Sequence, residues 1–438
     1  AKNTGCHVHY DYATRYVYDT NDNLTEIIDA NAYAIQHSDD QYWRDMRMEA
    51  GYVDINTGEG LLAAQLTATQ LNELAELYTT HLAYDNNGNL TSRIDNEDNL
   101  TTLTYTSFNK ISSETSAMGH ALTTSNEQFY QDKRVELGYV ADASLLSATD
   151  TADILALHTS SYVYDSNQNL TEIRTPGGDL TTFAYDSFGN VTNKTVYLDA
   201  SDLVDPAKQQ VTLYSYDAYG NNISTIEANA WSITNSDETY WQALRQEFGV
   251  IDGSGAGKLV ADLIQADIDL LTNKYTSSNT YDLFGNRTSY TDPNGGVTTY
   301  LYDNDNRLIS VSTPESNTTA YAYDSVGNRI GVTDANGHST IYVYDRNNML
   351  ISVQDWTTAT GLGADDRTTT YKYDVVGNGT SVTDANGVEI TYVYREDNRL
   401  VEILTPYVDD VNGVAVQYST TYAYDAVGRR ISINDNNG

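Results

Sequence analysis

The feature that most constrains the fold of this chain is a short motif that recurs along almost its whole length. In its fullest form the motif reads Tyr-x-Tyr-Asp-x-x-Gly-Asn, as between Tyr321 and Asn328. Neighbouring copies are often 21 residues apart, and a fixed period of this kind indicates a repeat array rather than a series of unrelated domains. Each copy is anchored on one tyrosine, and the thirteen anchors are Tyr18, Tyr84, Tyr105, Tyr164, Tyr185, Tyr216, Tyr281, Tyr302, Tyr323, Tyr344, Tyr373, Tyr394 and Tyr424.

Each position of the motif has a chemical reason. The alternation Tyr-x-Tyr is a period-two strand signal. The residue after the anchor is Asp except at Thr106 and Arg395, and a carboxylate there accepts backbone N–H groups and closes a turn. Four residues after the anchor the chain has Gly or Asn in all but two copies, and these residues tolerate positive φ. The predicted turn residues include Asp303, Asp324, Gly327, Asn328, Asp345, Asp374, Gly377, Asp425 and Gly428.

A second turn closes each period, as at Asp292–Gly295, Asp334–Gly337 and Asp384–Gly387. Asn-Gly between alternating apolar residues is a strong hairpin signal. Two strands and two turns per period give one antiparallel meander, which sheet twist curls. The predicted fold class is therefore mainly β: antiparallel β-hairpin repeats in a continuous spiral sheet, a hollow shell or barrel.

Three long insertions interrupt the array, at about 33–80, 120–159 and 231–275, and each is predicted to be a helical hairpin. In the first two, Ser38 and Ser125 begin a Ser-x-x-Gln capping box. A glycine then ends the first helix of each insertion, at Gly51, Gly138 and Gly249. The second helices are predicted at about 67–78, 149–157 and 259–271. Since every insertion begins at a second turn, all three should project from one edge of the sheet.

The first helix of each insertion carries two adjacent aromatic residues. Successive residues on a helix point about 100° apart, so one aromatic can pack inside the chain while the other meets a partner. Trp43, Tyr130 and Trp241 are the candidate interaction residues. Packing within the chain is the alternative interpretation.

Composition argues against several function classes. The formal net charge is −37, with 61 acidic residues against 24 Lys and Arg, which opposes binding to nucleic acid or anionic membranes. No apolar run reaches the length of a membrane span. A single cysteine, Cys6, excludes a disulfide within the chain.

No motif indicates catalysis, a cofactor or a metal. The seven histidines lack the His-Glu-x-x-His arrangement. The stretch from Gly253 to Lys258 resembles a phosphate loop, but Asp252 and Leu259 stand where Gly and Ser or Thr are needed. Asp19, Asp85 and Asp165 begin Asp-x-Asn-x-Asn segments that lack the later residues of an EF-hand loop. We therefore predict a protein that is not an enzyme, with calcium at an acidic loop as the alternative.

The phased Tyr-Asp-x-x-Gly-Asn copies resemble the Rhs/YD-repeat family. That family includes secreted polymorphic toxins, components of insecticidal toxin complexes, and teneurins. The resemblance implies a spiral β-sheet that forms a hollow shell.

From this resemblance we expect residues 1–438 to be one continuous array within a longer protein, because Asp435–Gly438 begins another second turn. The expected function is a non-catalytic shell wall or fibre, located extracellularly or on a cell surface. Its expected partners are enclosed cargo or further copies of the repeat. The alternative is an adhesin that binds a cell-surface protein or glycan through the helical insertions.

Overall fold

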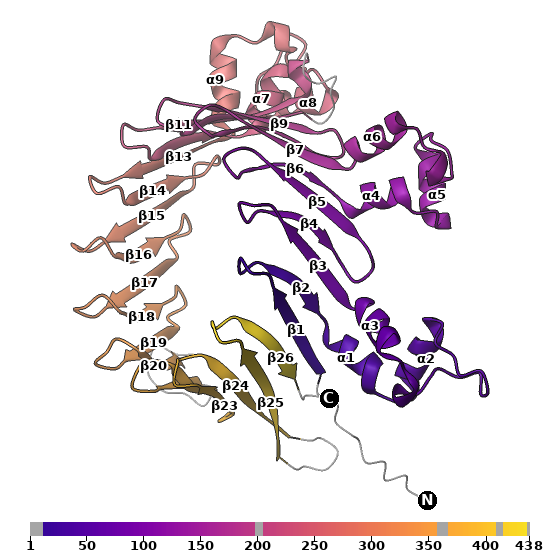
Figure 1. Ribbon diagram of the computed structural model, residues 1–438. Helices are drawn as coiled ribbons and strands as arrows, with labels where there is room; N and C mark the ends of the chain where they lie inside the picture. The colour runs from indigo at the N-terminus through magenta and orange to yellow at the C-terminus, as the bar shows by residue number, and fades with distance from the viewer. Residues whose placement is uncertain (1–11, 198–204, 357–366, 409–414, 436–438) are drawn as a thin grey trace, which may run out of the picture.

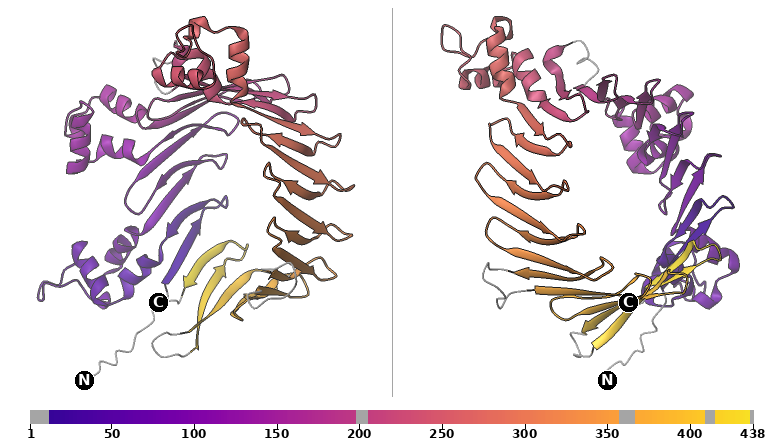
Figure 2. Two further views of the ribbon diagram at one scale, coloured as in Figure 1. Left: turned by 180° about the vertical axis from the view of Figure 1, so that it is seen from behind. Right: turned by 90° about the vertical axis from the view of Figure 1, so that its left-hand side faces the viewer.

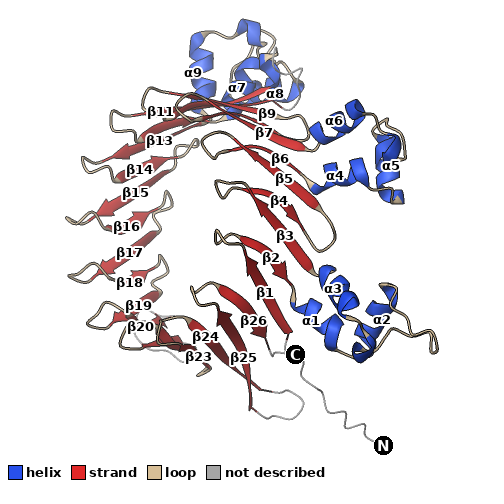
Figure 3. Ribbon diagram, viewed as in Figure 1, coloured by secondary structure: helices blue, strands red, loops and turns tan. Residues whose placement is uncertain are grey.

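The computed structural model describes residues 12–197, 205–356, 367–408 and 415–435. Cys6 and the turn residues after Asp435 lie outside these ranges. Within them the chain is dominated by short strands, in red in Figure 3, with helices confined to three places. No helix in the described ranges is long and apolar enough to cross a membrane.

The strands form pairs, one pair for each copy of the repeat. Their bounds are β1 Tyr12–Tyr18, β2 Leu24–Ile28, β3 Thr79–Tyr84, β4 Leu90–Ile94, β5 Leu100–Tyr105, β6 Ile111–Thr115, β7 Thr159–Tyr164, β8 Leu170–Arg174, β9 Leu180–Tyr185, β10 Val191–Tyr197, β11 Gln209–Tyr216, β12 Asn222–Ile226, β13 Thr276–Tyr281, β14 Arg287–Thr291, β15 Val297–Tyr302, β16 Leu308–Ser312, β17 Thr318–Tyr323, β18 Arg329–Thr333, β19 Ser339–Tyr344, β20 Leu350–Trp356, β21 Arg367–Tyr373, β22 Gly379–Thr383, β23 Glu389–Tyr394, β24 Leu400–Val408, β25 Ala415–Tyr424 and β26 Arg430–Asp435. Every odd-numbered strand ends on an anchor tyrosine, so the sequence period sets the hairpin period.

All 26 strands belong to one sheet in which each strand pairs antiparallel with the next along the chain. The sheet then closes, because β1 also pairs antiparallel with β26. Figures 1 and 2 show the resulting ring, with the indigo first strands beside the yellow last strands. The predicted antiparallel repeat shell is confirmed, and the spiral is a closed barrel.

Nine helices occur in the described ranges, three in each insertion. They are α1 Ala30–His37, α2 Gln41–Glu49, α3 Ala68–Glu76, α4 Ala117–Thr124, α5 Gln128–Glu136, α6 Ala148–Ala156, α7 Ala228–Asn235, α8 Thr239–Glu247 and α9 Gln265–Asn273. Short 3-10 turns lie at Ala63–Gln65, Ala143–Leu145, Pro206–Lys208 and Val260–Asp262. Each insertion joins an even-numbered strand to the following odd-numbered one, so all three leave the same edge of the sheet, as predicted.

The prediction of two helices per insertion is wrong, because α1, α4 and α7 precede the expected first helices. The capping box at Ser38 is wrong for the same reason. Ser38 is the residue that ends α1, and its Oγ accepts the N–H of Asp40 at 3.2 Å. The helix-ending glycines are where the sequence places them: Gly51, Gly138 and Gly249 have φ of 87°, 89° and 79°.

The ring itself has almost no buried core. Its strands alternate between half-buried and exposed residues, as in β15 and β17. Among the described residues, the buried apolar side chains lie in the insertions, apart from Leu180 and Val211. The solvent-accessible surface is 26192 Å², whereas a compact protein of 48.4 kDa would expose about 17,000 Å². This excess area is what a wall with solvent on both faces requires.

Candidate functional sites in the turns, the seam and the insertions

The Tyr-Asp turn is a type I turn followed by a left-handed residue. In the copy after Tyr323, the N–H of Gly327 donates to the carbonyl oxygen of Asp324 at 3.2 Å. Gly327 has φ of 99°. The N–H of Asp324 donates to the carbonyl oxygen of Asn328 at 2.9 Å and closes the loop. This is the three-residue hairpin loop with a bulge, and the register shifts at the anchor accordingly.

The Asp carboxylate holds that turn together. Oδ1 of Asp324 accepts the N–H groups of Val326 at 3.0 Å and Asn328 at 2.8 Å, and Oδ2 accepts Nδ2 of Asn328 at 2.8 Å. The carboxylates of Asp303, Asp345, Asp374 and Asp425 make the same Oδ1 bonds to the backbone. All thirteen residues in the left-handed slot have positive φ, including Gly377 at 97° and Gly428 at 94°.

The hydrogen bonds of the turn favour the charged carboxylate. The side chain of Asn89 donates to Asp85, and this bond, with the N–H of Asn89, lowers the pKa of Asp85 below its ordinary value. The pKa of Asp186 is lowered for the same reason by Asn190. These carboxylates are therefore structural acceptors and are ionised at neutral pH.

The short second turns have the same geometry as the first. The N–H of Gly295 donates to the carbonyl oxygen of Asp292 at 2.9 Å, and Gly295 has φ of 84°. The N–H of Gly296 donates to Oδ1 of Asp292 at 2.9 Å. The short turns at the two edges of the ring are thus loops of one kind.

A ladder of tyrosine hydroxyls joins most hairpins to the one before. The hydroxyl of Tyr323 donates to the carbonyl oxygen of Leu308 at 2.9 Å, six residues after the preceding anchor, Tyr302. The same bond, from an anchor to the residue six after the previous anchor, recurs at Tyr105, Tyr164, Tyr185, Tyr216, Tyr281, Tyr302, Tyr344, Tyr373 and Tyr424. The anchor tyrosines therefore connect neighbouring hairpins by hydrogen bonds in addition to packing on the sheet.

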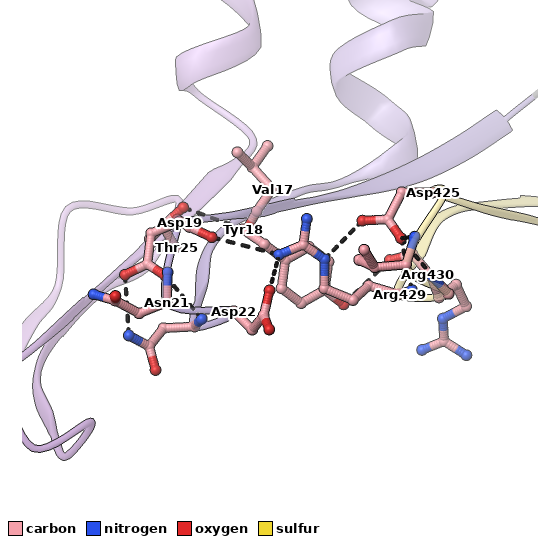
Figure 4. Close-up of polar contacts among 12 residues, drawn as sticks. Val17, Tyr18, Asp19, Asn21, Asp22, Thr25, Asp425, Arg429 and Arg430 are labelled. Atoms are coloured by element: carbon pink, nitrogen blue, oxygen red, sulfur yellow. Dashed lines mark hydrogen bonds and ion pairs between the residues drawn. The ribbon is translucent and has the colours of Figure 1, made fainter.

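The seam between β26 and β1 uses the same contacts. The hydroxyl of Tyr18 donates to the carbonyl oxygen of Arg430 at 3.2 Å, again six residues after an anchor. Arg429 lies over the ring of Tyr18 at 4.8 Å and pairs with Asp22 at 2.6 Å. Figure 4 shows Arg429 between Asp425 on the last hairpin and Asp22 on the first. Sequence reasoning missed this site because its residues lie at opposite ends of the chain.

Each insertion is centred on one fully buried arginine. Nη1 of Arg47 donates to the carbonyl oxygen of Ile35 at 2.6 Å, and Nε donates to that of Leu61 at 2.7 Å. Nη2 pairs with Asp39 at 3.1 Å. Arg245 makes the equivalent bonds to the carbonyl oxygens of Ile233 and Lys258 and to Asp237. One guanidinium thus ties three separate segments together, which only its fixed fork of donors allows.

The second insertion carries its negative charge elsewhere. Nη2 of Arg134 donates to Oδ1 of Asn126 at 3.0 Å, where the other two insertions have an aspartate. Nδ2 of Asn126 in turn donates to Oδ1 of Asp142 at 2.9 Å. Leu62 and Leu259 occupy the position of Asp142 in the other insertions, directly before the 3-10 turn. In the second insertion the carboxylate of Asp142 therefore reaches the arginine through Asn126 and does not contact it directly.

The predicted interaction residues are not the exposed ones. Trp43 is 6% exposed and packs against Ala34, Ile35 and Leu74, which contradicts an interaction role for it. Trp241 is half-buried against the cluster around Ile233, and Tyr130 is also half-buried. The other aromatic of each pair faces solvent: Tyr42, Phe129 and Tyr240 are 62%, 53% and 63% exposed. The sequence cannot say which member of each pair faces the neighbouring helix.

The residues weighed for other chemistry serve local structure. Both carboxylate oxygens of Asp19, Asp85 and Asp165 accept hydrogen bonds from residues of their own turns. Lys258, at the end of the glycine-rich stretch, pairs with Asp267 at 2.7 Å. In the ranges that the structure describes, no group of three or more His, Cys, Asp or Glu side chains is placed to hold a metal ion.

The profile of the RHS Repeat family matches four stretches, 164–202, 281–318, 302–338 and 323–360. Each match begins on an anchor tyrosine, and the last three begin at successive hairpins, at Tyr281, Tyr302 and Tyr323. A search of curated proteins finds no match.

Three solved structures illustrate the structural similarity, and the chain spans about a fifth of each matched chain. The crystal structure of TcdB2-TccC3-Cdc42 matches 97% of this chain and 22% of its own at 16% identity, with a TM-score of 0.34. The Photorhabdus luminescens Tc holotoxin pore matches 96% and 21% at 16% identity, with a TM-score of 0.35. TcdB2-TccC3 without its hypervariable C-terminal region matches 97% and 22% at 16% identity, with a TM-score of 0.34.

Proposed function

Because four stretches of this chain match the RHS Repeat family, we propose that it is a non-catalytic section of wall in a shell that encloses cargo. The observation that carries the proposal is the closed ring of strands, which has almost no buried core. The sheet has no free edge among its described strands, and the surface area far exceeds that of a compact protein.

The dimensions indicate how much of a shell one chain supplies. Most strands have five to seven residues, so the wall is about 20 Å tall at roughly 3.3 Å per residue. A hoop of this height surrounds a space but leaves it open at two ends. Further repeats or further copies of the chain would have to extend the wall, and these are the proposed partners together with the enclosed cargo.

The repeated residues support a structural role. The turn carboxylates and most anchor hydroxyls make hydrogen bonds that shape or join hairpins, and the left-handed residues set the turns. We propose an extracellular or cell-surface location, to which the acidic composition is suited because self-repelling surfaces stay soluble.

An adhesive role through the insertions has weaker support. It now depends on Tyr42, Phe129 and Tyr240, because Trp43 is committed to the core of its insertion. These three aromatics lie on separate insertions, and large exposed apolar side chains scattered singly are normal on protein surfaces.

Size-selective labelling tests the enclosing wall. Leu301 and Val311 lie on opposite faces of the β15–β16 hairpin, because Tyr300 pairs with Val311 and Leu301 with Ser310. In a Cys6→Ser background, Leu301→Cys and Val311→Cys should both react with a small maleimide. A maleimide on a polymer wider than the ring should react with one of them at least ten times more slowly, because such a polymer cannot pass through the open ends. Equal rates for the large reagent on both faces would rule out an enclosed interior.

A further inference from the structure

The seam between β26 and β1 repeats the strand register and most side-chain contacts of the internal junctions of the ring. At the seam, Ser432 pairs with Arg15. Ser432 lies eight residues after its anchor, Tyr424, and Arg15 lies three residues before its anchor, Tyr18. At the internal junction between β16 and β17, Ser310 pairs with Ala320 at the same two offsets. The strand register is therefore the same whether or not a turn joins the two hairpins.

The side chains repeat as well. Nε of Arg429 donates to Oδ2 of Asp425 at 2.7 Å, and Nε of Arg307 donates to Oδ2 of Asp303 at 2.7 Å. Nη1 of Arg429 donates to the carbonyl oxygen of Asp19 at 3.4 Å. Nη1 of Arg307 reaches the equivalent carbonyl oxygen, that of Asp324, at 3.2 Å.

Ring stacking completes the equivalence. Arg429 lies 4.8 Å from the ring centre of Tyr18, and Arg307 lies 5.1 Å from that of Tyr323. Arg430 lies over Tyr16 at 5.0 Å, and at a second internal junction, between β18 and β19, Arg329 lies over Tyr342 at 5.1 Å. The surface that β26 offers is thus complementary to the surface of any hairpin that carries the sequence of β1 and β2.

The seam differs from the internal junctions in how it is held. Within the described residues, the β16 and β17 hairpins are joined covalently by the turn from Thr313 to Asn317, and the two sides of the seam have no such link. In its place the seam has the Arg429–Asp22 ion pair, which the Arg307 junction lacks because Gly327 stands at the position of Asp22. The Asp22 side chain is 74% exposed, so this pair holds weakly.

We infer that the seam is an exchangeable joint, at which β26 of one chain pairs with β1 of a second copy in the same register. The partner is a second copy because the complementary surface is built from residues of this chain. Exchange of identical elements between copies adds no new type of contact and is a low-cost route to dimers. At low concentration the chain's own β1 has the higher effective concentration, so the closed ring prevails.

Split cysteine pairs test the inference in a Cys6→Ser background. Thr14 and Ile433 are paired across the seam. One batch of chain carries Thr14→Cys and another carries Ile433→Cys, and the two are unfolded, mixed and refolded together. A short thiol crosslinker should then join residue 14 of one chain to residue 433 of another, with a yield that rises with protein concentration.

The matched control splits an internal pair. Thr319 and Val311 are paired across the β16–β17 junction, so Thr319→Cys and Val311→Cys on separate chains should stay unlinked after the same treatment. A seam yield no higher than this control at every concentration would overturn the inference. As a second check, oxidising Thr14→Cys and Ile433→Cys within one chain should abolish exchange between labelled rings.

The contacts of Arg429 across the seam should together set the exchange rate. When separately folded rings are mixed, Arg429→Gln should exchange at least three times faster than the parent chain. Arg307→Gln removes the equivalent internal contacts and should leave the rate unchanged, with circular dichroism confirming that both variants fold. Equal acceleration by both variants would show general loosening of the wall and would contradict a specific joint.

Discussion

At the scale of single residues, the left-handed slot of the Tyr-Asp turn makes a sharp prediction. A Cβ on Gly327 would meet only Nη1 of Arg307, at 3.9 Å, so space is not what excludes a side chain. The φ of 99° is strained for any β-branched residue. We expect Gly327→Val to destabilise the chain by about 1–3 kcal/mol, measured as a lower denaturation midpoint.

The neighbouring position provides the control. Val326 is 68% exposed, and Val326→Ala should change stability by less than about 0.5 kcal/mol. If the two variants unfold at the same denaturant concentration, the turn does not depend on its left-handed residue.

Residue chemistry that acts within a few positions could be predicted from the sequence. In each Tyr-Asp turn the Asp carboxylate accepts backbone N–H groups from the residues two and four positions later. A single copy of the motif is therefore enough to predict the turn and its residue with positive φ. The buried arginines could not be predicted in this way, because Arg on a helix usually faces solvent. Their equal offsets in the three insertions were the available signal.

At the scale of the insertions, the position of the carboxylate in the second insertion predicts that substitutions at Asn126 and Asp142 have non-additive effects on stability. Asn126→Asp alone would place a second carboxylate against Asp142, and Asp142→Leu alone would leave Arg134 without its nearby negative charge. The double variant restores the arrangement of the first and third insertions. We expect it to be more stable than the sum of the single effects predicts, with a coupling of about 1–2 kcal/mol.

Hydrogen exchange in α4, α5 and α6 would measure this coupling locally, with Asp237→Asn in the third insertion as the reference for loss of a direct charge partner. Additive effects of the two substitutions would show that Asp142 does not compensate the charge of Arg134.

The helices α1, α4 and α7 were not predicted because each begins within the expected second turn, where Asp29-Ala30-Asn31 looks like a loop.

At the scale of the whole molecule, the many turn carboxylates predict how stability depends on pH. Hydrogen bonds from neighbouring Asn side chains lower the pKa of Asp85, Asp186 and Asp282 in the folded chain. Their stabilisation is fully present above the unfolded pKa of about 3.9 and is lost as pH falls through the folded value. We expect the melting temperature to hold between pH 7 and 5, where repulsion among 37 net negative charges eases, and to fall steeply below pH 4.

Salt provides the control for that profile. At pH 7 added salt screens the repulsion and should raise the melting temperature, whereas below pH 4 it cannot replace the lost acceptors. Loss of stability already between pH 6 and 5 would assign the transition to histidines instead. The sequence predicted a spiral or barrel but could not say that closure joins the first strand to the twenty-sixth, because this depends on small twist angles summed over all hairpins.

Because the seam is equivalent to the internal junctions, the hairpins follow one another in a fixed order around the ring, but no junction is structurally marked as the start. Which hairpin comes first along the chain is a matter of where the backbone is cut, since the last hairpin meets the first as any hairpin meets its successor. A circular permutant opened within the short turn at Asp334–His338, with the present ends linked, would make the same wall from a different starting point.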